Sequence, residues 1–142
     1  MASTSVVAVE TNNARNVIIR ATMVSDGTNG ESVTVYDATS SGAFGVTVGG
    51  QTFYPGTHTA LVGLDYDVQD MKIRVMWEAT ADQDILPLGS APEDFNWTRF
   101  GGIRVPSGLV GATGSIKIVN VDPVVNATYS AILYLRKNVP QS

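Results

Sequence analysis

The chain has 142 residues, a formal net charge of −4 at pH 7 and no cysteine. This length suits one domain with a sizeable core. The acidic balance argues against a nucleic-acid partner held by a basic surface. The lack of cysteine excludes disulfides, thiolate nucleophiles and cysteine-bound metals.

Charged residues make up 15% of the chain, against about 25% in a typical domain. We therefore expect a largely uncharged surface that partner subunits cover, and no intrinsic disorder. No run reaches the roughly 18 apolar residues of a membrane span, and the N-terminus lacks the features of a signal peptide. These features predict an unprocessed chain made in the cytoplasm, without a membrane partner.

The first predicted element is a strand from Ser5 to Glu10, which contains an apolar run from Val6 to Val9. This run is short for an independent core strand. Two interpretations remain open for residues 1–13. They form an arm that adds to a neighbouring sheet, or they form the first strand of their own sheet.

Residues 17–24 and 31–38 are rich in β-branched side chains, and the segment SDGTNG between them contains Asp-Gly and Asn-Gly dipeptides. This arrangement predicts a β-hairpin. Two further segments are rich in glycine or contain two prolines, residues 40–57 and residues 82–97. Both are predicted to be surface loops or weak edge strands.

A strand is predicted from His58 to Val68, and another over residues 71–78, where apolar side chains recur at every second position. A weaker strand is predicted from Phe95 to Phe100. The segment GLVGATG, with glycines at three-residue spacing, predicts a tight corner. Two strands follow, over residues 115–122 and 129–136, and we predict that they pair with each other.

These segments give about eight short strands and no sustained helical period. We therefore predict an all-β fold, a single-domain antiparallel β-sandwich or jelly roll. The domain is expected to span residues 14–142, because no linker divides them. The predicted core face comprises Val17, Ile19, Met71, Ile73, Val75, Trp77, Leu133 and Leu135.

Titratable residues give little support for catalysis. His58 is the only histidine, and no nucleophile-elbow motif accompanies it, so we interpret it as a strand-edge or interface residue. Glu93 and Asp94 are adjacent, and adjacent side chains of an extended segment diverge, which does not suit a glycosidase pair. We predict no enzyme activity, no catalytic residue and no cofactor.

Two acidic stretches have the oxygen ligands that Ca²⁺ prefers: Asp65, Asp67 and Asp70 in one, and Asp82 with Asp84 in the other. Neither stretch has the glycine and distal glutamate of an EF-hand loop. We interpret these residues as turn and surface acids and predict no metal site.

Four aromatic residues are candidates for a sugar-stacking platform, because aromatic rings supply a large apolar area at a low entropic cost. They are Trp77, Trp97, Tyr54 and Tyr66. Trp77 lies on the predicted core face, which leaves Trp97 and Tyr54 as the credible pair.

Five segments follow one another along the chain: ARNVIIRATMVSDGTNGES, MKIRVMWEAT, FNWTRFGGI, GATGSIKI and ATYSAILYLRK. With these segments and its short polar start, the chain resembles small virion structural proteins of tailed bacteriophages, in particular head decoration or cement proteins. The resemblance implies a jelly-roll-like domain, self-association, binding on the capsid exterior and no catalytic residues. The segment GAFGVTVGGQTFYPG is not part of this resemblance.

We interpret the chain as a structural virion protein that binds the major capsid protein on the outside of a phage head and reinforces the shell. We expect a homo-oligomer, a trimer at local threefold positions in preference to a dimer. The alternative is a carbohydrate-binding module or a receptor-binding virion tip domain, which would use Trp97, Tyr54 and loop acids.

The capsid contact is predicted on two segments, Ala2 to Asn13 and Asp82 to Trp97. The first is able to add a strand to an exposed edge. The second carries apolar anchors that its prolines stiffen. The predicted contact residues are Val6, Val7, Val9, Ile85, Leu86, Leu88 and Trp97.

Overall fold

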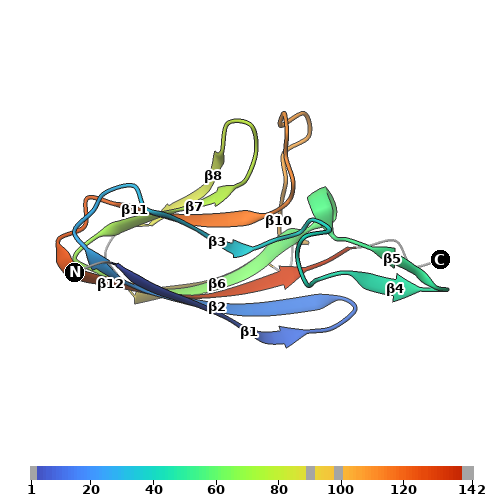
Figure 1. Cartoon of the computed structure of the whole chain (residues 1–142), viewed down its shortest axis with the longest axis horizontal. Coiled ribbons are helices and arrows are strands. Elements are labelled where there is room, and N and C mark those ends of the chain that lie inside the picture. The colour runs from blue at the N-terminus through green and yellow to red at the C-terminus, as the bar shows by residue number, and fades with distance from the viewer. Residues whose placement is uncertain (1–2, 89–91, 98–100, 139–142) are drawn as a thin grey trace.

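The computed structural model describes residues 3–88, 92–97 and 101–138, and it is built from two packed antiparallel sheets (Figure 1). The larger sheet has the order β1-β2-β12-β6-β10, with β9 also paired to β6. Its strands are β1 (Thr4–Asn12), β2 (Asn16–Asp26), β6 (Ala60–Gln69), β9 (Pro92–Asn96), β10 (Ile103–Arg104) and β12 (Val125–Arg136).

The smaller sheet has the order β3-β11-β7-β8. Its strands are β3 (Ser32–Tyr36), β7 (Lys72–Trp77), β8 (Gln83–Leu88) and β11 (Ile116–Val121). A separate hairpin of β4 (Val46–Val48) and β5 (Gln51–Phe53) extends from one end of the molecule, and the 3₁₀ segment η1 (Gly56–His58) follows it (Figure 1). The prediction of an all-β antiparallel sandwich is confirmed, whereas the jelly-roll connectivity stays a prediction.

The core lies between the two sheets and is formed by every second residue of the long strands. In β2 and β12 the buried residues alternate with exposed or half-buried ones along almost the whole strand, as expected for strands with one face toward a core. All eight residues of the predicted core face are at most 3% exposed. The alternation in the sequence therefore predicted the buried face correctly.

The predicted hairpin of residues 17–24 and 31–38 is wrong, although both strands exist. β2 pairs with β1 and β12, and β3 pairs with β11 in the other sheet. The connection between them crosses from one sheet to the other and is held by Asn120, which is fully buried. The Glu31 backbone N–H donates to Asn120 Oδ1 (2.6 Å), and Asn120 Nδ2 donates to the Thr28 carbonyl (3.1 Å).

The predicted pairing of residues 115–122 with the last strand is also wrong. β11 lies between β3 and β7, whereas β12 lies between β2 and β6. The chain changes sheet between β11 and β12. Asp122 (φ +48°), directly after β11, and Asn126 (φ +69°), near the start of β12, adopt the left-handed conformation that asparagine and aspartate tolerate better than most residues.

The segments predicted as loops or weak edge strands contain most of the strands beyond the expected eight; the described ranges hold twelve in all. Residues 40–57 form the β4–β5 hairpin, and its neighbour Phe44 is buried with its ring 4.8 Å from that of Tyr36. Residues 82–97 include β8 and β9, which confirms the edge-strand interpretation. The end of the weaker predicted strand, residues 98–100, lies outside the described residues.

Candidate functional site

The strand β1 is the terminal strand of the larger sheet. It pairs with β2 along one edge, and along its other edge no strand of the described residues pairs with it. Every residue of β1 is exposed except Thr11, which is half-buried. A terminal strand with so little buried surface is unusual in a stable sheet, because strands normally cover at least one face against a core.

Three valines of β1 expose apolar surface on both faces of the sheet. Val6 is 57% exposed, Val7 40% and Val9 50%. Val7 and Val9 lie opposite Ala21 and Ile19, which point into the core. These two valines nevertheless stay exposed, so the smaller sheet does not extend over β1.

Val24 enlarges this surface and was not among the predicted contact residues. It is 43% exposed and pairs with Thr4, diagonally across from Val6 on the outer face. The sequence could have shown that Val24 is exposed, because neighbouring residues of a strand point to opposite faces and the preceding residue, Met23, is buried. We refer to Val6, Val7, Val9 and Val24 as the β1 surface.

Side-chain contacts hold both ends of β1 in its own sheet. At the start, Ser3 Oγ accepts from the Asp26 backbone N–H (3.0 Å) and lies 2.5 Å from Glu31 Oε1. At the end, Lys137 Nζ donates to Asn12 Oδ1 (2.7 Å). Lys137 is buried, and this burial lowers its pKa. Residues 4–12 therefore form the first strand of their own sheet, one of the two interpretations that the sequence left open.

The second set of predicted contact residues lies against the core. Leu88 is 5% exposed and pairs with Ile73, so its side chain is not available at the surface, contrary to its predicted role as an anchor. Ile85, Leu86 and Trp97 are half-buried and pack against the same core. The segment Asp82 to Trp97 thus consists largely of two edge strands, which pair with β7 and β6. Their apolar side chains, which the sequence assigned to a partner, pack against the protein's own core instead.

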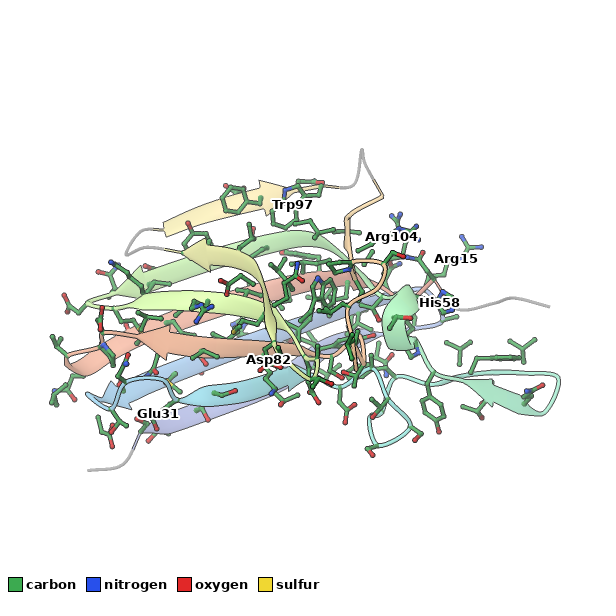
Figure 2. All side chains as sticks on the ribbon, turned by 90° about the horizontal axis from the view of Figure 1, so that it is seen from above. Arg15, Glu31, His58, Asp82, Trp97 and Arg104 are labelled. Atoms are coloured by element: carbon green, nitrogen blue, oxygen red, sulfur yellow. The ribbon has the colours of Figure 1, made fainter. Side chains whose placement is uncertain are left out.

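Trp97 directly follows β9 (Figure 2). Its ring stacks on that of Phe95, with ring centroids 5.4 Å apart and an interplanar angle of 12°. Tyr54, the other residue of the predicted sugar platform, is 39% exposed and lies in the region of the β4–β5 hairpin, near Gly45. Trp97 and Tyr54 therefore belong to different parts of the molecule, and the structure does not bring them together as one platform.

Asp82 and Asp84, one of the two acidic stretches that the sequence singled out, have structural partners. Arg74 forms a bidentate pair with Asp84 (2.8 and 2.9 Å). Asp82 lies 3.1 Å from Lys117 Nζ, and a hydrogen bond from the Ala79 backbone N–H is the main cause that lowers its pKa. Within residues 3–88, 92–97 and 101–138, no three histidine or acidic side chains are grouped in a way that could hold a metal ion.

His58 is exposed at the end of η1 (Figure 2), and its carbonyl oxygen accepts a hydrogen bond from Asn138 Nδ2 (3.0 Å). Asp94 is exposed on β9, while the side chain of its neighbour Glu93 lies outside the described residues.

No helix in the described part of the chain is long and apolar enough to cross a membrane. Comparisons with models of protein families, with curated proteins and with solved structures gave no significant match.

Proposed function

We propose that this chain is a structural virion protein, which binds the major capsid protein on the outside of a phage head and reinforces the shell. The observation that carries the proposal is β1, a strand with three exposed valines and with one edge that pairs with no strand of the described residues. The resemblance of the sequence to decoration proteins supplies the partner, and the low content of charged residues suits a surface that other subunits cover.

The β1 edge has few of the features that usually prevent strands from pairing with other chains, the main one being a register shift against β2 between Val9 and Thr11. Natural edge strands are often protected by lysine, proline, bulges or an inward-pointing charge. Between Thr4 and Asn12 there is neither proline nor lysine, and the only charged residue, Glu10, lies 3.4 Å from Arg20. An edge of this kind suits strand addition, in which backbone hydrogen bonds give affinity and side-chain pockets give specificity.

The same proposal includes a closed homo-oligomer, with a trimer preferred to a dimer. A closed ring limits association that an open edge would otherwise propagate into fibres. Native mass measurement at micromolar concentration should therefore give a trimeric mass. A strictly monomeric mass together with no binding to assembled capsids would contradict the proposal.

The variant Val6→Asp/Val9→Asp tests the β1 surface, because it places charge on both faces of the strand. Burying one valine is worth about 1.5–3 kcal/mol, so losing two should weaken binding to undecorated heads by roughly 100-fold or more. Sedimentation with the heads measures occupancy. The matched control is Val110→Asp/Val124→Asp, which adds the same charge at valines that are 74% and 56% exposed elsewhere.

The control variant should decorate heads at wild-type occupancy, and circular dichroism should show that both variants are folded. If the wild-type chain does not bind undecorated heads, the proposed function is wrong. If the folded β1 variant decorates as the wild type does, the docking surface lies elsewhere, and residues 40–57 become the next segment to test.

A further inference from the structure

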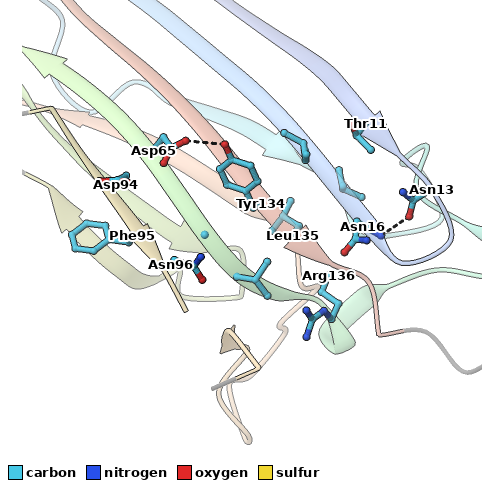
Figure 3. A pocket seen from close by; sticks show the side chains of 14 residues that line it. Thr11, Asn13, Asn16, Asp65, Asp94, Phe95, Asn96, Tyr134, Leu135 and Arg136 are labelled. Carbon is cyan, nitrogen blue, oxygen red and sulfur yellow. Dashed lines mark hydrogen bonds between the residues drawn. The ribbon is translucent and has the colours of Figure 1, made fainter. Parts of the chain in front are cut away.

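The outer face of the larger sheet carries a groove of about 490 Å³ that the sequence analysis did not identify as a site (Figure 3). It crosses β2, β12, β6 and β9 on the side away from the core. Its volume lies in the range of small-molecule sites in proteins, roughly 300–1,000 Å³. The residues that matter to the argument are Gly63, Asp65, Asp94, Asn96, Tyr134 and Arg136.

An aromatic ring forms the floor of this groove. Tyr134 on β12 pairs with Gly63 on β6. A Cβ atom at Gly63 would lie 3.2 Å from Tyr134 Cδ2 and 3.3 Å from the Phe95 carbonyl oxygen, closer than most real contacts. Glycine at this position therefore leaves the space that the ring occupies beside β6.

The ring of Tyr134 is held at its far end as well. Its hydroxyl donates to Asp65 Oδ2 over 2.8 Å (Figure 3). This hydrogen bond is the main cause that raises the pKa of Tyr134, so the phenol stays protonated and keeps its role as donor. The ring is thus fixed before any ligand arrives, which reduces the entropy lost on binding.

Polar groups surround the ring. Asp94 pairs with Asp65, and Asn96 pairs with Gly63, so both flank the ring on the β9 side. Arg136 pairs with Asn16 on the β2 side. Figure 3 shows these side chains around the groove together with Asn13, whose Oδ1 accepts from the Asn16 backbone N–H (2.8 Å).

This combination matches the chemistry of a sugar. A pyranose ring offers an apolar C–H face that packs on an aromatic ring. It also offers neighbouring hydroxyls, to which carboxylates and guanidinium groups form bidentate hydrogen bonds. The groove lining carries two carboxylates and one guanidinium, so an anionic ligand such as a phosphate gains no net attraction there.

We propose that this groove binds a neutral saccharide of one or two residues, stacked on Tyr134 and hydrogen-bonded by Asp94, Asn96 and Arg136. None of these ligand-binding residues belongs to the β1 surface, although Thr11 of β1 borders the groove. It also differs from the sugar platform that the sequence predicted at Trp97 and Tyr54.

Saturation-transfer NMR on the full chain tests the site with a panel of glucose, galactose, mannose, N-acetylglucosamine, lactose and maltose. At least one member should bind. In a separate amide spectrum, its addition should shift only resonances of β2, β6, β9 and β12 and of Thr11 and Asn13, which line the groove. Tyr134→Ala should weaken binding by about tenfold or more, whereas Tyr134→Phe should retain most of it. Asp94→Ala, at an exposed position, removes a hydrogen-bonding group without touching the core.

The matched control is Tyr54→Ala, which removes an exposed tyrosine outside the groove and should leave binding unchanged. The proposal is overturned if no panel member shows saturation transfer. It is also overturned if binding survives in the folded Tyr134→Ala and Asp94→Ala variants, or if it is lost in Tyr54→Ala. Loss of head decoration in Asp94→Ala, without any sugar binding by the wild type, would identify the groove as a protein interface instead.

Discussion

Replacing Trp77 by alanine should lower the free energy of unfolding by about 3–5 kcal/mol, the usual cost of truncating a buried tryptophan. Trp77 is 1% exposed at the end of β7, and it pairs with Ile116 on one side and Gln83 on the other. Its removal leaves a cavity between the sheets that neighbouring strands on both sides prevent from closing. The loss is a large fraction of the 5–15 kcal/mol that typically stabilises a domain.

Urea denaturation measures this loss, with Val110→Ala as the control. Val110 is 74% exposed, so its truncation should change the free energy of unfolding by no more than about 0.5 kcal/mol. An unchanged denaturation midpoint for Trp77→Ala would show that the buried and exposed faces of β7 are exchanged.

Gly114→Ala should also destabilise the fold strongly, and clearly more than Gly108→Ala. Both glycines have positive φ, +81° and +85°, so each substitution carries the roughly 1–2 kcal/mol cost of a left-handed conformation with a side chain. Of the two, only Gly114 would place its new Cβ against backbone, where it would collide with the Gly56 carbonyl oxygen, whereas nothing lies within 4 Å at Gly108.

The comparison of the two glycine variants separates the steric clash with Gly56 from the cost of placing a side chain at positive φ, which both variants share. Thermal unfolding of both variants gives the difference directly. Gly114→Ala should have the lower midpoint, because the corner before β11 must move away from η1. Equal midpoints would mean that the corner and Gly56 do not approach each other in solution.

The sequence predicted the buried faces of the strands better than their partners. The alternation around Trp77 and around Leu133 depends only on which face meets the core, so it is visible in one strand alone. The partner of a strand depends on where the chain goes next. The Asp-Gly and Asn-Gly dipeptides after β2 indicate a change of direction, and such a turn serves a hairpin or a crossing between sheets equally well.

The same limit explains the outcome for the candidate sites. The valines of β1 could be singled out from one segment, whereas the burial of Leu88 depends on its pairing with Ile73 across the sheet. The groove on the outer face needs the register of β12 against β6, which sets Tyr134 beside Gly63. A glycine inside a strand indicates a close approach, but only the fold shows what approaches it.

Amide hydrogen exchange of the chain, free and bound to undecorated heads, tests the central claim most directly. Amides at an unpaired strand edge exchange fast, and pairing with a second strand protects them. The account predicts that binding strongly slows exchange between Thr4 and Asn12 and leaves the β4–β5 hairpin unchanged. Unchanged exchange in β1, with new protection in residues 40–57 or elsewhere, would contradict it.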